Sequence, residues 1–337
     1  MGYDRAEALT VSQPTRAVIT LATTKPVFVG MAFALARSFF YWNRDPGLKF
    51  HLVTDLAVEL PADLRAMELI RVEPGKLGVG FSPKLHLDSL VPADRTLFID
   101  SDCLCFGPLD YVFQRFAGRP LGVVGRTLSS GLWFCDIAKT RERFGLGPLP
   151  QFNGGLYYLE RGSEVTALYQ RARELEAQYD EIGLIRLRGR PNDEILIALA
   201  MAERGLAPVP EDGTILGNVD TIYPVVEQLD VLRGICRMTN PPAPDPRHVP
   251  GHPVSESRAR IVHFLDYGTE KWPYRCEELK IRLVQKHGLP VPLARAAADA
   301  TIGLGGRASD AFKETFRPAY RRLFGTRRIK ATEKGTI

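Results

Sequence analysis

LFIDSDCLCF, residues 97 to 106, places two carboxylates, Asp100 and Asp102, directly after an apolar run that is typical of a buried strand. Side chains alternate between the two faces of a strand, so both carboxylates are expected on the same side. Two anions this close repel each other unless a cation lies between them. The stretch therefore predicts a strand that ends in a site for a metal ion or a proton.

Apolar runs alternate with helix-like patterns on both sides of this stretch. Strands are predicted at 16–24, 49–55 and 95–100, and helices at 26–42, 61–69 and 82–90. This alternation predicts an α/β fold with a doubly wound, mostly parallel sheet and flanking helices. Ligands of such sheets bind beyond the carboxyl ends of the strands, where the Asp100–Asp102 pair lies.

The rest of the chain adds further elements and a tail. Strands are predicted at 121–125, 154–160 and 260–266, helices at 163–178 and 193–204, and a proline-rich surface loop at 239–253. An Ala/Gly-rich stretch, residues 293–306, is expected to be a connector. We therefore divide the chain into a main domain, residues 1–290, and a connector with a basic tail, residues 291–337.

The composition is that of a globular protein with a basic tail. Of the 337 residues, 45% are hydrophobic and 25% are charged. The net charge is +5, and the residues from 301 onward carry nine Lys or Arg against three Asp or Glu. The remaining chain is close to neutral, which argues against nucleic-acid binding by the main domain.

Several features bear on cellular location. The polar N-terminus, MGYDRAEALT, has no signal-peptide pattern, and the apolar run at 26–36 is too short to span a bilayer. The five cysteines include no CxxC pair, which favours a reduced setting. Cys103 and Cys105 alternate away from the carboxylates and are expected to pack in the core. We expect a cytoplasmic protein, either soluble or peripheral at the inner face of the membrane.

Four blocks of the sequence follow the order found in a known enzyme family. They are SPKLHLDSLVPADRTLFIDSDCLC (82–105), FNGGLYYLE (152–160), NDEILIAL (192–199) and HFLDYGTEKWPY (263–274). These blocks resemble those of the family 8 glycosyltransferases, which include glycogenin and bacterial lipooligosaccharide galactosyltransferases. The resemblance covers about residues 16–275 and implies the GT-A fold for the main domain.

The resemblance implies a metal site beside a donor site. The implied metal ligands are Asp100, Asp102 and His263, and an imidazole suits Mn²⁺ better than Mg²⁺. Asn192 and Asp193 match positions near the reacting carbon and are the implied catalytic residues. The implied donor-binding residues are Ala22, Thr23, Thr24, Lys84, Ser101, Asn153, Gly154, Gly268 and Lys271.

Some of these residues also have purely structural interpretations. His263 fits a core histidine at a strand end, and Lys271 fits an exposed lysine. Asn192 and Asp193 are residue types that cap helix N-termini. Gly154 fits a simple turn before a strand.

The implied reaction transfers a hexose from a UDP-sugar to a glycan or lipid-linked acceptor, with a divalent metal and with retention of configuration. Thr23 and Thr24 stand where the family has an acidic contact to uracil, and His263 and Lys271 are eight positions apart instead of six. Asp193 stands where the family has Gln, and a carboxylate there could act as a nucleophile or stabilise an oxocarbenium-like charge.

Two alternative functions remain open. One is a nucleotide-sugar-binding subunit that has lost catalysis, which the altered Lys-Trp-Pro order at 271–273 would fit. The other is a haloacid-dehalogenase-type phosphatase, whose Asp-x-Asp motif requires Thr or Val where this chain has Leu104. An insertion at 126–151 is expected to shape the acceptor pocket, with Trp133 and Phe134 either stacking on a sugar or packing in a core.

The tail sequence SDAFKETFRPAYRRLFGTRR, residues 309–328, has an amphipathic pattern. Its aromatic and leucine residues recur at helical spacing between several arginines and a lysine, although Pro318 is expected to break or kink the helix. Such a segment can lie in the interface of an anionic membrane. The alternative is that its apolar side packs on the main domain or on a partner subunit.

Overall fold

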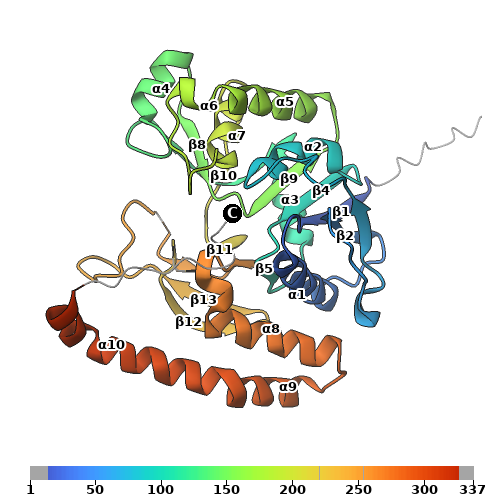
Figure 1. The fold of residues 1–337 in the computed structure, drawn as a ribbon, viewed down its shortest axis with the longest axis vertical. Helices are drawn as coiled ribbons and strands as arrows, with labels where there is room; N and C mark the ends of the chain where they lie inside the picture. Colours follow the sequence, from blue (N-terminus) through green and yellow to red (C-terminus); the bar gives the residue numbers. More distant parts are fainter. Residues whose placement is uncertain (1–13, 220, 253, 326–337) are drawn as a thin grey trace, which may run out of the picture.

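The computed structural model describes residues 14–219, 221–252 and 254–325. Its centre is a six-stranded sheet in the order β3-β2-β1-β4-β9-β6 (Figure 1). The strands are β1 (Arg16–Leu21), β2 (Leu48–Thr54), β3 (Glu68–Arg71), β4 (Arg95–Ile99), β6 (Leu121–Gly122) and β9 (Leu156–Glu160). The first four run parallel, and β9 pairs antiparallel with β4 and β6. The expected α/β fold with a mostly parallel sheet is confirmed.

Helices cover both faces of this sheet, because successive residues of each strand face opposite sides. On one face, Val18 of β1 lies in a core cluster with Leu35 of α1 (Pro26–Trp42). On the other face, Ile19 lies in a cluster with residues of α5 (Ser163–Ala177) and α7 (Asp193–Ala202). The near-continuous apolar sequence of β1 is what a strand buried on both sides requires.

Three small sheets lie beside the main one. The first contains β10 (Val209–Pro210), β7 (Val124–Leu128) and β8 (Leu149–Phe152). The second contains β11 (Leu216–Asn218), β15 (Ile261–His263) and β5 (Cys103–Cys105). The third contains β12 (Val225–Asp230), β13 (Ile235–Thr239) and β14 (Glu256–Ser257). The pairing of β15 with β5 sets His263 opposite Cys103, which follows Asp102 in the chain. Because of this register, His263, although late in the sequence, lies next to the carboxylate pair.

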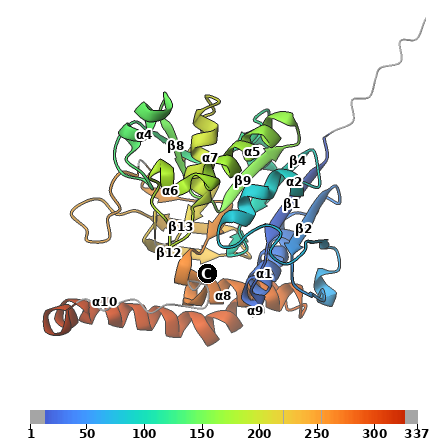
Figure 2. The ribbon, with the colours of Figure 1, turned by 45° about the horizontal axis from the view of Figure 1, so that its top comes forward.

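The remaining α-helices are α2 (Leu87–Leu90), α3 (Asp110–Phe116), α4 (Ile137–Phe144), α6 (Tyr179–Ile182), α8 (Trp272–Gln285), α9 (Val291–Ala298) and α10 (Leu304–Phe324). Short 3₁₀ turns occur at Ala62–Leu64, Ser82–His86 and Asp266–Glu270, and a π-helical turn at Asp299–Gly303 joins α9 to α10. Both views show α10 extending past the rest of the molecule (Figures 1 and 2).

One segment differs from the sequence prediction, and another takes a conformation that was not predicted. Residues 61–69 were expected to form a helix, but after one 3₁₀ turn the chain enters β3, because parallel pairing with β2 sets Leu69 beside Leu52. Residues 293–306, expected to be a connector, are helical. Alanine favours helix, and Ala294 packs in the same core cluster as Ile281 of α8.

Helix α10 continues through Pro318, where a break or kink was expected. Its aromatic side chains are largely exposed: Phe312 is 63% exposed and Phe324 is 71% exposed. The ring of Phe312 contacts that of Phe316 in a tilted arrangement, at 4.4 Å between ring centres. Within the described ranges, no helix is both long enough and apolar enough to cross a bilayer. The basic residues from 326 onward lie outside the described residues.

Candidate active site

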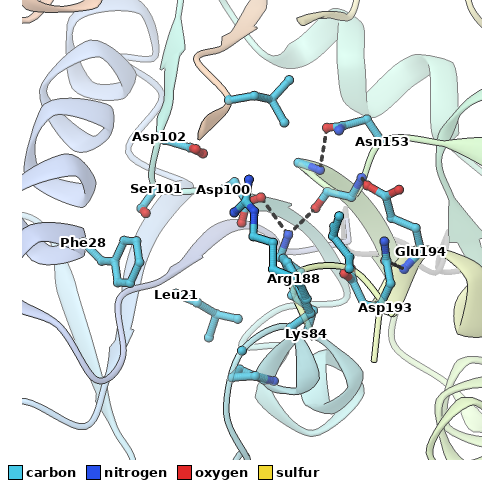
Figure 3. Close-up of a pocket in the computed structure, with 18 of the residues that line it drawn as sticks. Leu21, Phe28, Lys84, Asp100, Ser101, Asp102, Asn153, Arg188, Asp193 and Glu194 are labelled. Atoms are coloured by element: carbon cyan, nitrogen blue, oxygen red, sulfur yellow. Dashed lines mark hydrogen bonds and ion pairs between the residues drawn. The ribbon is translucent and has the colours of Figure 1, made fainter. Parts of the chain in front are cut away.

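A cavity of about 330 Å³ opens where β1 and β4 end. This is the edge at which parallel sheets bind ligands. Eleven residues implied by the family resemblance line it: Thr23, Thr24, Lys84, Asp100, Ser101, Asp102, Asn153, Gly154, Asn192, Asp193 and His263. Figure 3 shows side chains from several elements converging on this space. The fold therefore brings most of the predicted site residues together.

The carboxylates of Asp100 and Asp102 meet the ring of His263. His263 Nε2 lies 3.0 Å from an oxygen of Asp102 and 3.8 Å from an oxygen of Asp100. His263 and Asp102 are almost fully buried, at 2% and 6% exposure. Both carboxylates thus lie near Nε2 of His263, and carboxylate oxygens and imidazole nitrogens are ligands that bind divalent metals.

Hydrogen bonds to the other ring nitrogen define the state of His263. Nδ1 lies 2.8 Å from Oδ1 of Asn153 and 3.2 Å from Oδ1 of Asn218. The Asn153 oxygen also accepts a hydrogen bond from the backbone N–H of Gly155. Because carbonyl oxygens only accept, Nδ1 must carry the proton that it donates to them. The 3.0 Å contact between Nε2 and Asp102 then requires a positive charge at Nε2, either a proton on the ring or a bound cation.

Cys103 is closer to this point than the sequence suggested. Its sulfur, an oxygen of Asp102 and a nitrogen of His263 all lie within 4.8 Å of one another. The thiol is buried and packs in the core cluster of α1 and β1, as expected. It lies 4.0 Å from the carbonyl of Gly155, toward which it can donate a weak hydrogen bond.

Lys84 supplies the positive charge beside the carboxylates. Its ammonium donates to Asp100 Oδ2 at 2.7 Å and to the carbonyl of Gly154 at 2.8 Å (Figure 3). Burial disfavours the charged ammonium, but the carboxylates of Asp100 and Asp193 outweigh burial and raise the pKa of Lys84. The lysine is therefore fully charged at neutral pH.

The N-terminus of α7 forms the opposite wall. Asn192 caps the helix, with its side-chain oxygen accepting the backbone N–H of Glu194 at 2.7 Å. Its side-chain nitrogen, Nδ2, is buried with no hydrogen-bond partner among the described residues. A buried donor without a partner is unfavourable, so it indicates a ligand atom that accepts from it. The capping role is therefore real, and it leaves one side of the amide available to a ligand.

Asp193 is held rigidly next to this amide. One of its oxygens accepts the hydroxyl of Tyr157 at 2.6 Å. Burial raises the pKa of Asp193, and the charge of Lys84 and the Tyr157 hydrogen bond act against that rise. A carboxyl group fixed in this way is positioned to contact a bound substrate.

Glu194 is a site residue that the sequence analysis missed. It lines the cavity, and its Oε1 accepts the backbone N–H of Gly154 at 2.8 Å. Burial, followed by the adjacent charge of Asp193, raises the pKa of Glu194 to about 8. The signal was present in the sequence as a third polar residue in Asn-Asp-Glu, but a glutamate in a first helical turn is common for dipole reasons alone.

Backbone strain is concentrated at this cavity. Thr24, Phe134 and Arg188 are the described non-glycine residues with positive φ, at 66°, 53° and 52°, and all three line it. Such conformations are unfavourable for residues with a Cβ atom and tend to occur at functional sites. For Phe134 the sequence left open whether the ring stacks on a sugar or packs in a core, and Arg188 was not predicted as a site residue, because loop conformation leaves no clear pattern in the sequence.

Three predicted donor-binding residues do not line the cavity. Ala22 is buried in the core at 1% exposure, where it is too far inside to touch a ligand with its side chain. Gly268 is buried next to Phe264, and Lys271 lies at the start of α8. The roles implied for these three residues stay predictions.

The chain matches no protein-family model and no curated protein sequence. Solved structures that it resembles include the galactosyltransferase LgtC in complex with donor and acceptor sugar analogues, at 14% identity and a TM-score of 0.44, covering 60% of this chain and 75% of that one. They also include mouse xyloside xylosyltransferase 1, at 14% identity and a TM-score of 0.43, covering 60% and 87%. The glycosyltransferase GlyE of Streptococcus pneumoniae TIGR4 is similar at 16% identity and a TM-score of 0.38, covering 58% and 45%.

These structural neighbours are glycosyltransferases, as the sequence resemblance led us to expect. Their likeness to this chain is remote, so it assigns neither a residue nor a substrate. The site is therefore interpreted from its own geometry.

Proposed function

We propose that the protein is a metal-dependent glycosyltransferase of the GT-A type that transfers a hexose from a UDP-sugar to a glycan or lipid-linked acceptor. The observation that carries this proposal is the convergence of Asp100, Asp102 and Nε2 of His263 at the end of β4. Such a set fits Mn²⁺ or Mg²⁺, which would supply positive charge to neutralise a diphosphate leaving group.

The other residues of the cavity suit the two ends of a nucleotide-sugar. Thr23 and Thr24 follow β1 and are assigned to the nucleoside, with Thr24 held by a hydrogen bond from its N–H to Asp55 at 2.8 Å. Lys84 is assigned to the side of the diphosphate and Ser101 to the donor. Asn153 and Gly154 are assigned to the sugar.

Asn192 and Asp193 are assigned to the reacting end of the donor. The unpartnered Nδ2 of Asn192 would donate to a sugar hydroxyl, and the carboxyl of Asp193 would face the developing charge at C1. In the transfer, the bond from C1 to the diphosphate oxygen breaks with its electron pair leaving on UDP. The acceptor oxygen bonds to C1 and loses its proton, with retention of configuration at C1.

Donor preference can be tested without knowing the acceptor. We expect UDP with Mn²⁺ to raise the melting temperature more than GDP, ADP or CDP with Mn²⁺, and UDP-glucose or UDP-galactose to be hydrolysed slowly in the same buffer. Chelation by EDTA should remove both effects. Hydrolysis that persists fully in EDTA would exclude a metal-dependent transferase, and binding of UDP without any hydrolysis would favour a catalytically inactive binding subunit.

We also propose that α10 lies on an anionic membrane surface. The helix exposes Phe312, Phe316, Tyr320, Leu323 and Phe324, and it carries Lys313, Arg317 and Arg322 among them. Large apolar side chains bordered by cations are the composition that binds the interface of an anionic bilayer, at about 1 kcal/mol per cation near the surface. Such a location would suit a lipid-linked acceptor.

The membrane proposal predicts charge-dependent flotation. Reversing two charges with Arg317→Glu and Arg322→Glu should reduce binding to phosphatidylglycerol vesicles by at least about 30-fold, because about 2 kcal/mol of attraction is lost and repulsion by the two glutamates is added. Arg65→Glu with Lys76→Glu, which reverses two exposed charges on the main domain, is the matched control. If both double variants float equally well, or if the aromatic face instead forms a dimer in solution, α10 is not a membrane-binding helix.

A further inference from the structure

A second cavity, of about 220 Å³, adjoins the first. The two share three lining residues, Asn153, Glu194 and Leu265. Among the described residues, Glu194 is the one ionisable side chain that lines both. It is therefore placed where a group in one cavity would meet a group in the other.

The side chain of Glu194 is fixed at one oxygen only. The Oε1 atom of Glu194 accepts a hydrogen bond from the backbone N–H of Gly154 at 2.8 Å. The backbone N–H of Glu194 donates to the side-chain oxygen of Asn192, the residue that caps α7. The Oε2 atom of Glu194 has no hydrogen bond to any other described residue. Figure 3 shows Glu194 beside Asn153 and Asp193, at the side of the first cavity that faces away from Phe28. One oxygen thus anchors the carboxyl group while the other can contact a substrate.

The second cavity has the lining of a saccharide site. Trp133 lies in it, packed edge-on against Phe152. Around this ring are planar polar groups: Arg126, whose Nε donates to Gln151 at 2.7 Å, and Glu211, which accepts the hydroxyl of Tyr223 at 3.0 Å. An aromatic surface with fixed donors and acceptors at its rim matches a sugar, which has an apolar ring face and polar edges.

Unsatisfied groups in this cavity also indicate a ligand. His252 Nδ1 is buried with no hydrogen-bond partner among the described residues. The terminal nitrogens of Arg126 likewise make no hydrogen bond to a described residue. Two consecutive aromatic residues line different cavities: Phe134, which has a positive φ, lines the first, and Trp133 lines the second.

We infer that the second cavity holds a saccharide acceptor against Trp133. Glu194 then contacts the acceptor hydroxyl that attacks the donor sugar. The inference rests on the proposed glycosyl transfer. As the acceptor oxygen bonds to C1 and the diphosphate leaves with the electron pair of the broken bond, the hydroxyl proton passes to Glu194. A carboxyl group with a raised pKa is the stronger base once ionised, which suits this step.

The test separates acceptor binding from chemistry. Methyl β-galactoside, methyl β-glucoside and methyl β-glucuronide are titrated against the protein with UDP and Mn²⁺ present, and tryptophan fluorescence is followed. We expect at least one glycoside to change the fluorescence, and Trp133→Phe to remove that change. If none of the three does so in the wild type, the second cavity is not a saccharide site.

Transfer from the UDP-sugar to the glycoside that binds is then measured. Glu194→Gln keeps an oxygen for Gly154 and should lower kcat for transfer about 100-fold with little change in the glycoside KM. Trp133→Ala should raise that KM about tenfold. Glu181→Gln, at an exposed position, is the matched control. Both variants should still be stabilised by UDP with Mn²⁺.

Failure of this inference differs from failure of the proposed function. If the wild-type protein hydrolyses the UDP-sugar but the Glu194→Gln variant transfers as fast as wild type, only the role of Glu194 is overturned. Wild-type protein that releases no UDP from any UDP-sugar overturns the transferase proposal and, with it, the acceptor site.

Discussion

Asp102→Asn is expected to reduce Mn²⁺-dependent turnover of the UDP-sugar about a thousandfold while leaving the metal-free protein at least as stable as wild type. The amide that replaces the carboxylate is a poor metal ligand. It can, however, hydrogen-bond to Nε2 of His263, which lies 3.0 Å from an oxygen of Asp102. Removing one of two neighbouring anions also relieves repulsion.

The measurement is a melting curve with and without Mn²⁺, together with the turnover rate. Wild type should be stabilised by Mn²⁺, whereas Asp102→Asn should lose this stabilisation without a lower melting temperature in EDTA. Asp180→Asn, at a surface residue paired with Arg186, is the matched control. The opposite result, a variant that melts lower in EDTA yet responds normally to Mn²⁺, would mean that a proton on His263 holds the carboxylates together.

The sequence predicts the carboxylate pair and its place in the fold because both depend on local pattern. An apolar run followed by Asp-Ser-Asp identifies a strand end, and alternation with helices identifies a parallel sheet. The structure has β4 ending at Ile99, with the two carboxylates at the cavity. These features require no knowledge of distant contacts.

Other parts of the site depend on contacts between segments that are far apart in the chain. His263 reaches Asp102 because β15 pairs with β5, a register that no local pattern contains. From its residues alone the favoured interpretation was a core histidine, and only the family resemblance suggested a ligand. Glu194, Phe134 and Arg188 enter the site through a helix N-terminus and strained loops, where residue type says little about direction.

The segment at 61–69 shows the same limit in the fold. Pro61 and the residues after it have a composition that suits a helix, but Leu69 pairs with Leu52 in the parallel sheet. The stability of a strand at a sheet edge comes from its neighbour, and this tertiary contact outweighs the weak local preference.

Lys84→Met is expected to destabilise the protein by about 3 kcal/mol at neutral pH and to abolish donor turnover. The ammonium of Lys84 lies 2.7 Å from Asp100 and also interacts with the charges of Asp193 and Glu194. Without it, these carboxylates face one another in a partly buried site with no cation to compensate them. Breaking a buried ion pair by removing one partner is unfavourable for this reason.

The stability deficit of Lys84→Met should depend on pH in a defined direction. Asp193 and Glu194 have pKa values raised in the folded protein, to about 8 for Glu194, and loss of the lysine charge raises them further. A carboxyl group whose folded pKa lies above its unfolded value binds more protons in the folded state, so stability falls as pH rises between the two values. The deficit should therefore be small near pH 4 and grow toward pH 8.

Urea unfolding from pH 4 to pH 8 measures this dependence, and Lys76→Met, at an exposed lysine, serves as the control. Adding Mn²⁺ sharpens the experiment, because a cation bound by Asp100 and Asp102 would replace part of the lost positive charge. Mn²⁺ should then stabilise Lys84→Met more than it stabilises wild type. A deficit that is constant across this pH range and indifferent to Mn²⁺ would show that Lys84 acts by packing over Phe98, at 5.5 Å from the ring centre, and not by its charge.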